Sequence, residues 1–165
     1  MATTALQGHP VHTCGELPQV AAPAPDFTVV KPDLSECSLG DLKGKQVVIN
    51  IFPSVDTPVC AASVRRFNQE ASTRENTVVL CLSRDLPFAG ARFCAAEGLD
   101  KVITVSDFRN PSFAQLYGTL LVDGPLAGLH ARAVVVVGED GLVKHAELVA
   151  DITREPNYEA ALAAL

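Results

Sequence analysis

The sequence lacks an apolar run long enough to cross a membrane, and its opening segment, Met1–Pro10, has neither the basic start nor the apolar core of a secretory signal. It also lacks any basic cluster larger than Arg65-Arg66, and its net charge is −6. This charge argues against binding to a phosphate backbone. No linker, internal repeat or low-complexity tract divides the 165 residues. We therefore expect one domain, residues 1–165, that binds neither nucleic acid nor a membrane.

Cysteine pairs with the spacing of metal or redox motifs are missing as well. The five cysteines, at positions 14, 37, 60, 81 and 94, include no Cys-x-x-Cys pair and form an odd number. This pattern fits neither a zinc site nor the disulfide framework of a small secreted protein. Motifs of Ser-His-Asp hydrolases and of phosphate-binding loops are absent too. We expect free thiols in a reducing compartment, the cytoplasm, and neither a metal nor a cofactor.

The most informative segment is Gln46–Arg66, which predicts a buried strand, a short loop and a helix. Val47–Phe52 is a nearly unbroken run of β-branched and aromatic residues, as expected of a strand covered on both faces. Pro53 ends this strand. Thr57 followed by Pro58 predicts a helix start, with the threonine side chain accepting a hydrogen bond from a free amide. Such strand-to-helix junctions are where α/β folds carry their active sites.

Cys60 falls in the first turn of this predicted helix. Free amides and the positive end of the helix dipole favour a thiolate there, so we expect a lowered pKa for Cys60. Cys60, Val64 and Phe67 share one helical face, which should place the thiol against the strand at the floor of a pocket. Thr57 stands where a thioredoxin-type motif has its second cysteine, so no local disulfide can close. The alternative is a buried structural cysteine.

The remaining elements alternate between strand and helix. Thr77–Ser83 predicts a second buried strand, parallel to the first through a right-handed crossover. The other predicted strands are Phe27–Val30, Val102–Val105, Arg132–Val137 and Leu142–Val149, and the other predicted helices are Pro87–Glu97, Ser112–Tyr117 and Tyr158–Leu165. Thr4–Thr13 predicts a hairpin that turns at Gly8, His9 and Pro10. This order predicts an α/β, thioredoxin-like fold, with a central mixed sheet, helices on both faces and an N-terminal β-hairpin extension.

Two stretches resemble a known family. Pro53–Cys60 has the Pro-x-x-x-Thr-x-x-Cys pattern of the peroxiredoxins, in the matching strand and helix context. Ser83–Ala89 followed by Arg92-Phe93-Cys94 looks like the thiol peroxidase subfamily, the atypical two-cysteine peroxiredoxins, and the similarity covers almost the whole chain. The resemblance implies an enzyme that reduces hydrogen peroxide and organic hydroperoxides, with thioredoxin as reductant and a homodimeric assembly.

The resemblance also implies roles for individual residues. Cys60 would attack the peroxide beside Pro53 and Thr57, and Cys94 would resolve the resulting sulfenic acid as an intramolecular disulfide. Peroxiredoxins place an arginine on a late strand near these residues, and Arg132 occupies the matching position. On the residues alone, a solvated strand-end arginine is the favoured interpretation of Arg132, and Cys94 is equally a core thiol.

Other residues keep alternatives open. His130 could share a strand face with Arg132, although a thiolate needs no general base. Cys81 is interpreted as an inert core thiol. Gly90 weakens the helix Pro87–Glu97 and makes it a candidate for local unwinding, unless the glycine only permits close packing. Cys14 and Cys37 have no part in the subfamily's mechanism and leave other thiol pairings open.

Two other functions remain to be tested. A thiol-disulfide oxidoreductase acting on protein disulfides is disfavoured by Thr57. A redox sensor or interaction domain on the same scaffold would need neither an arginine beside its thiol nor a recycling partner. Multiple-turnover loss of peroxide with thioredoxin would separate a peroxidase from both.

Overall fold

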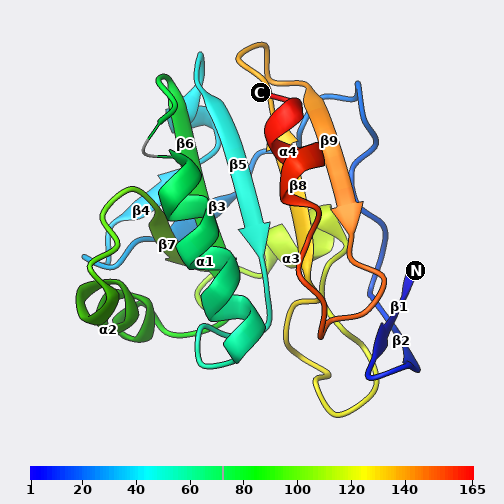
Figure 1. Ribbon diagram of the computed structural model, residues 1–165. Helices are drawn as coiled ribbons and strands as arrows, with labels where there is room; N and C mark the ends of the chain where they lie inside the picture. Colours follow the sequence, from blue (N-terminus) through cyan, green and yellow to red (C-terminus); the bar gives the residue numbers. More distant parts are fainter. Residues whose placement is uncertain (72) are drawn as a thin grey trace.

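The computed structural model, which describes residues 1–71 and 73–165, is built on a seven-stranded sheet with the order β4-β3-β7-β6-β5-β8-β9 (Figure 1). The three neighbouring strands β7, β6 and β5 are parallel, and β3 and β8 flank them in the antiparallel direction. The strands are β3 (Thr28–Val30), β4 (Glu36–Ser38), β5 (Gln46–Ile51), β6 (Thr77–Ser83), β7 (Ile103–Ser106), β8 (Ala133–Val137) and β9 (Val143–Leu148). The predicted mixed sheet is confirmed.

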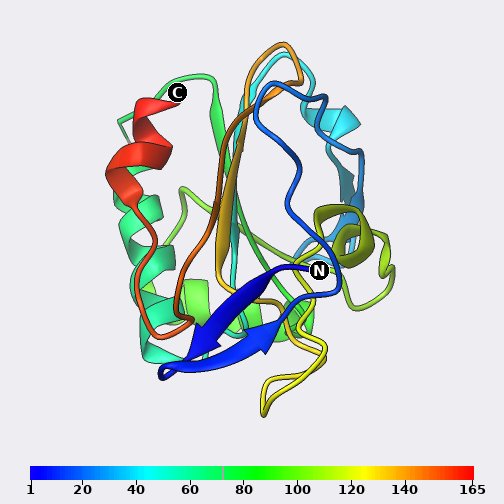
Figure 2. The same cartoon turned by 90° about the vertical axis from the view of Figure 1, so that its right-hand side faces the viewer.

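Helices cover both faces of this sheet (Figures 1 and 2). On one face lie α1 (Pro58–Ala71), α2 (Pro87–Glu97) and α4 (Tyr158–Ala163), and on the other lies α3 (Ser112–Tyr117). Successive side chains of a strand point to opposite faces, so Val48 packs in the layer of α1 while Val47 and Ile49 pack in the layer of α3. Double coverage explains why β5 is apolar along nearly its whole length.

The N-terminal hairpin forms a separate two-stranded sheet of β1 (Thr3–Leu6) and β2 (His9–His12). Its turn consists of Gln7 and Gly8, which have φ values of 51° and 81°. The predicted turn at Gly8, His9 and Pro10 is therefore wrong, because Leu6 pairs with His9 and leaves a two-residue loop. Such loops need positive φ at both positions, which favours Gly8 in the second. Pro10 is tolerated within β2 because a two-stranded sheet has only edge strands.

The other differences from prediction are small. Most predicted bounds agree to within one or two residues, and β6, α2 and α3 have the predicted bounds. Two short elements before β5 were missed, the strand β4 and the 3₁₀ turn η1 (Gly40–Leu42). Among the described residues, no helix combines the length and the apolar character needed to cross a membrane.

Candidate active site

The loop of the predicted motif connects the end of β5 to the start of α1. Phe52 continues the pairing beyond β5, because its amide donates to the carbonyl of Leu82 in the parallel neighbour β6 (3.1 Å). Pro53 is buried and has no amide hydrogen with which to continue the ladder. The amide and the hydroxyl of Thr57 both donate to the carbonyl of Ser54, at 3.2 and 3.0 Å. These two bonds close a tight turn that leads the chain into α1.

The observed bond of the Thr57 side chain differs from the predicted helix cap. We expected its hydroxyl to accept a hydrogen bond from a free amide, but the hydroxyl donates to the Ser54 carbonyl. The main-chain carbonyl of Thr57 accepts from the amide of Ala61 (3.0 Å) instead. The turn brings the Ser54 carbonyl within reach of the hydroxyl, and this carbonyl accepts the hydrogen bond of the hydroxyl.

Cys60 and Arg132 meet although they are 72 positions apart. Helix α1 directs the Cys60 side chain toward the sheet, where the thiol is fully buried in the apolar layer that contains Val48 and Val64. Arg132 directly precedes β8, and β8 pairs antiparallel with β5, so the arginine stands at the end of β5 where the loop begins. Its Nη2 donates to Cys60 Sγ at 3.1 Å. The structure thus places the expected arginine against the expected nucleophile.

Arg132 is a buried cation, with only 2% of its surface exposed. Its Nε donates to the main-chain carbonyl of Ile152 (2.8 Å), while Nη1 has no hydrogen-bond partner within the described part of the chain. None of the ion pairs found among residues 1–71 and 73–165 includes Arg132. Because an unpaired buried charge is costly, the guanidinium favours electron-rich partners at both terminal nitrogens, Cys60 Sγ at Nη2 and a ligand at Nη1.

Asp85 holds the start of the loop, a role that the sequence analysis missed. Its carboxylate accepts hydrogen bonds from the Ser54 hydroxyl (2.8 Å), the Val55 amide (2.9 Å) and the Ser83 hydroxyl (2.9 Å). Asp85 follows β6, whose carboxyl end lies beside that of β5 because the two strands are parallel. A carboxylate just beyond the neighbouring parallel strand was the signal that could have identified it.

A buried polar chain links β5 to the main chain of Cys60. Asn50 Nδ2 donates to Ser63 Oγ at 3.1 Å, and the Ser63 hydroxyl donates to the Cys60 carbonyl at 2.7 Å. Both side chains are fully buried. The first turn of α1 is thereby attached to the central strand by hydrogen bonds as well as by packing, and unwinding it has to break them.

Cys94 lies near the end of α2 and is half-buried, and this burial raises the pKa of its thiol. Its carbonyl accepts from the amide of Gly98, whose φ of 67° ends the helix. Gly90 faces β7, where an added Cβ would lie 2.6 Å from Thr104 Oγ1. The alternative reading of Gly90 therefore holds in part, because the glycine permits close packing of α2 on a neighbouring side chain.

Two exposed ion pairs join α2 to the segment that carries Cys60. Arg65 of α1 binds both carboxylate oxygens of Glu97, at 2.7 and 3.2 Å. Arg92 of α2 donates to Asp56 of the active-site loop at 3.1 Å. Exposed pairs add little stability because water and salt screen them. The contacts that keep α2 against α1 at the surface are thus weak ones.

The remaining cysteines lie outside this arrangement. All five cysteines are free thiols in the structure. Cys81 is buried in the middle of β6, and burial raises the pKa of its thiol to about 12. Cys37 is also buried, and its pKa is raised by the same cause. Cys14 is exposed, and its thiol donates to the carbonyl of Ala114 at 3.3 Å.

His130 is fully buried, and both of its ring nitrogens have other partners than Cys60. Its Nδ1 lies 2.9 Å from the Thr119 hydroxyl and its Nε2 lies 2.9 Å from a carboxylate oxygen of Asp107. The side chain therefore joins the loop before β8 to the end of β7. This arrangement does not support a general-base role for His130.

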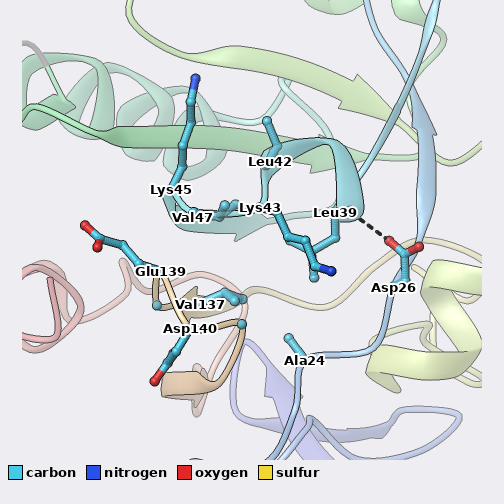
Figure 3. A pocket seen from close by; sticks show the side chains of 14 residues that line it. Ala24, Asp26, Leu39, Leu42, Lys43, Lys45, Val47, Val137, Glu139 and Asp140 are labelled. Carbon is cyan, nitrogen blue, oxygen red and sulfur yellow. Dashed lines mark hydrogen bonds between the residues drawn. The ribbon is translucent and has the colours of Figure 1, made fainter.

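A hollow of about 770 Å³ lies at the opposite end of the sheet (Figure 3). Lys43 and Lys45 line one side of it, and Glu139 and Asp140 line the other. Its floor includes Val47, at the amino end of β5, whereas Cys60 lies near the carboxyl end of that strand. This hollow is therefore separate from the candidate site around Cys60.

Known proteins are similar to this chain over nearly its whole length. Residues 19–162 match the Redoxin family model. A thiol peroxidase of Mycobacterium tuberculosis is 56% identical, over all of this chain and 99% of the relative. The crystal structure of a peroxiredoxin-like protein from Aquifex aeolicus is 39% identical and superposes with a TM-score of 0.93, covering 99% of this chain and 96% of that one.

A more distant structure, the thiol peroxidase from Chromobacterium violaceum, shares 19% identity and has a TM-score of 0.89 over 98% of this chain and 93% of that one. At that identity the likeness concerns the fold alone. Like the peroxiredoxin-like structure, it has the same fold over nearly the whole of this chain. The predicted thioredoxin-like fold is confirmed, and the chain belongs to the Redoxin family and, within it, to the thiol peroxidases.

Proposed function

We propose that this protein is a thiol-dependent peroxidase in which Cys60 reduces hydrogen peroxide and organic hydroperoxides. The observation that carries this proposal is the buried contact of 3.1 Å between Arg132 Nη2 and Cys60 Sγ. The second terminal nitrogen, Nη1, has no partner within the described residues and is free to bind a peroxide oxygen. One guanidinium can therefore hold both the nucleophile and the peroxide, with Nη1 at the oxygen that will leave.

In the first step the Cys60 thiolate attacks one oxygen of the O–O bond. The S–O bond forms, the O–O bond breaks, and the electron pair of that bond leaves with the other oxygen as alkoxide or hydroxide. Arg132 stabilises the negative charge on this leaving oxygen, which then takes a proton and departs as alcohol or water. Sulfur is oxidised to a sulfenic acid and the peroxide is reduced.

Pro53 and Thr57 complete the site in this proposal. The buried Pro53 forms a wall of the loop and limits the access of water to the reacting sulfur. The Thr57 hydroxyl, which donates to the Ser54 carbonyl, keeps lone pairs that can accept a hydrogen bond from the incoming peroxide. Asp85 keeps both residues in place through its bonds to Ser54 and Val55.

Recycling is proposed to use Cys94. Its thiol condenses with the Cys60 sulfenic acid, forming an intramolecular disulfide and releasing water. Thioredoxin then reduces this disulfide by thiol exchange and becomes oxidised itself. A homodimer in the cytoplasm and a single domain over residues 1–165 are part of the same proposal. Its support is the family, together with a half-buried Cys94 on a helix that exposed ion pairs join to α1 and to the active-site loop.

Multiple-turnover kinetics test the proposal. We expect loss of hydrogen peroxide coupled to oxidation of NADPH through thioredoxin and its reductase, with Cys60→Ser inactive and Cys37→Ser like wild type. Peroxide loss that stops after one equivalent would favour the redox sensor. Reduction of insulin disulfides without peroxide turnover would favour the oxidoreductase. Comparing hydrogen peroxide, an alkyl hydroperoxide and a lipid hydroperoxide then identifies the preferred substrate.

A further inference from the structure

The hairpin of β1 and β2 is bonded to the segment Val149–Thr153 that follows β9, and Figure 2 shows the two side by side. The Thr4 hydroxyl donates to the carbonyl of Val149 at 2.7 Å, a buried bond across 145 positions. The amide of Ile152 donates to the carbonyl of Ala5 at 2.8 Å. The hairpin is therefore attached to this one segment at several points.

Asp151 is the centre of this attachment. Its carboxylate accepts from the amides of Gln7 (3.3 Å) and Gly8 (2.9 Å) in the hairpin turn, and from the amide (2.9 Å) and hydroxyl (2.6 Å) of Thr153. The positive φ values of Gln7 and Gly8 let their successive amides converge on one anion. These bonds, that of the Thr153 hydroxyl first, hold the pKa of the Asp151 carboxyl well below its usual range.

Ile152, the residue after Asp151, binds Arg132 of the active site. The carbonyl of Ile152 accepts from Arg132 Nε at 2.8 Å, and this is the bond that leaves Nη2 against Cys60. The Ile152 side chain is 4% exposed and packs with Val11 of β2 and with Ala131. The amide of Ile152 is thus bonded to the hairpin while its carbonyl orients the guanidinium.

We propose that Asp151 is a positioning residue of the peroxidase, which by binding the hairpin turn fixes the Ile152 carbonyl and thereby aims Arg132 at Cys60. The proposal rests on the function proposed for Cys60 and Arg132. In this proposal the hairpin helps to hold the active site in place. Small displacements matter here, because misplacing a reacting group by about 1 Å can cost roughly 100-fold in rate.

The test compares Asp151→Asn with Asp123→Asn in the reduced full-length protein. Asp123 also binds the hairpin, through the amide (2.8 Å) and Nδ1 (2.6 Å) of His12, but none of its hydrogen bonds within the described part of the chain involves the segment that holds Arg132. In Asp151→Asn an amide NH₂ group replaces one acceptor oxygen and opposes a backbone amide. We expect its rate of Cys60 oxidation by hydrogen peroxide, followed by stopped flow, to fall by about tenfold or more. Asp123→Asn should oxidise at the wild-type rate.

Two readouts separate positioning from a general loss of stability. The pH profile of Cys60 alkylation by iodoacetamide should change in Asp151→Asn and not in Asp123→Asn, even where both lower the melting temperature. In an Arg132→Ala background, Asp151→Asn should reduce oxidation by less than about twofold further, since coupled residues are not additive. If Asp151→Asn does not fold, Thr153→Val, which removes the bond of 2.6 Å, is read in the same way.

A wild-type oxidation rate and alkylation profile in Asp151→Asn would overturn the positioning role and leave the peroxidase proposal standing. An equal loss with and without Arg132 would overturn it too, because the effect would not pass through the guanidinium. If the wild-type enzyme itself failed to consume peroxide, the proposed function would fail. The alkylation profiles would still report whether Asp151 acts on the environment of Cys60.

Discussion

At the scale of single residues, Arg132 is the side chain on which the proposed chemistry depends most. Arg132→Lys keeps the positive charge but replaces a fork that contacts both Ile152 and Cys60 with a single point charge. We expect the rate of Cys60 oxidation to fall by more than about tenfold, within the range of roughly 10²–10³ that a lost electrostatic donor commonly costs. Stopped-flow oxidation by hydrogen peroxide measures it. Wild-type kinetics would return Arg132 to the role of a structural residue.

Cys81 and Cys60 should differ sharply in reactivity although both are buried. Burial raises the pKa of the Cys81 thiol to about 12, so very little of it is ionised at pH 8, whereas Cys60 lies against the cationic guanidinium of Arg132. We expect iodoacetamide at pH 8 to modify Cys60 in the native protein and Cys81 only after denaturation. Peptide mapping by mass spectrometry distinguishes the two. Equal labelling of both sites in native protein would contradict the interpretation of Cys81 as an inert core thiol.

The sequence predicted the two side chains that meet at 3.1 Å: the helix start after a buried strand pointed to Cys60, and the resemblance to a known family pointed to Arg132. It was not sufficient to find Asp85 or Asp151. These carboxylates act on backbone amides brought close by the fold, across 30 positions for Val55 and 143 for Gly8. Nearly every residue has a backbone amide, so a sequence pattern cannot show which amide binds a given carboxylate. Only the folded structure shows it.

At the scale of elements, α2 carries the thiol proposed to resolve the sulfenic acid. Cys94→Ser should leave the first oxidation of Cys60 nearly intact and stop turnover with thioredoxin, because no thiol remains to condense with the sulfenic acid. A dimedone-type label on Cys60 after one equivalent of peroxide is the readout, and Cys14→Ser is the control. Normal cycling of Cys94→Ser would mean that Cys14, Cys37, Cys81 or an outside thiol resolves.

The packing of α2 on β7 depends on Gly90. In Gly90→Ala the new methyl group would lie 2.6 Å from Thr104 Oγ1 and 2.8 Å from Thr104 Cβ. Alanine favours a helix by about 1 kcal/mol over glycine, but Thr104 Cβ belongs to the strand and cannot swing away. We expect a lower free energy of unfolding, measured by urea titration, and faster disulfide formation. Ala95→Gly, at an exposed position of α2, isolates the effect of helix propensity. A gain in stability for Gly90→Ala would show that propensity dominates.

Element bounds were predictable where the chain has its own stop signals. Pro87 and Gly98 bracket α2, so its predicted bounds agree with the structure. The three-residue strand β4 was missed because it carries too short a pattern, and it is a strand only through pairing with β3. The hairpin turn was misplaced by one or two residues because Gly8, His9 and Pro10 are all turn-forming types. Pairing between Leu6 and His9 decides among them.

At the scale of the whole molecule, the order of strands and helices predicted the mixed sheet, because buried parallel strands and their crossover helices leave a strong apolar pattern. The attachment of the hairpin to the segment after β9 left no such pattern. It joins the first and last parts of the chain through Thr4, Ala5 and Asp151, and it becomes visible only when the sheet has brought both ends to one edge. Long-range contacts of this kind are a property of the fold.

The final prediction concerns a motion that involves both active-site helices. In the reduced enzyme, the Cα atoms of Cys60 and Cys94 should lie more than roughly 7 Å apart, beyond the reach of a disulfide. Cys60 faces the sheet in the first turn of α1, where Arg132 and the bond from Ser63 hold it. Cys94 lies near the end of another helix. One sulfur cannot be packed for attack on peroxide and also be aligned with its resolver, so one or both segments must unwind.

We expect α2 to unwind before the first turn of α1. Helix α2 is held to α1 and its loop by exposed ion pairs with Arg65 and Asp56, and it packs its inner face on β7, whereas buried hydrogen bonds attach the first turn of α1 to β5. We expect hydrogen exchange to show lower protection in the oxidised than in the reduced protein, over residues 87–98 most strongly and over residues 55–65 to a lesser degree. Strands β5 and β6 serve as the internal control and should keep their protection. Unchanged protection in both helices, with a reduced crystal structure already at bonding distance, would refute local unfolding while leaving the peroxidase proposal intact.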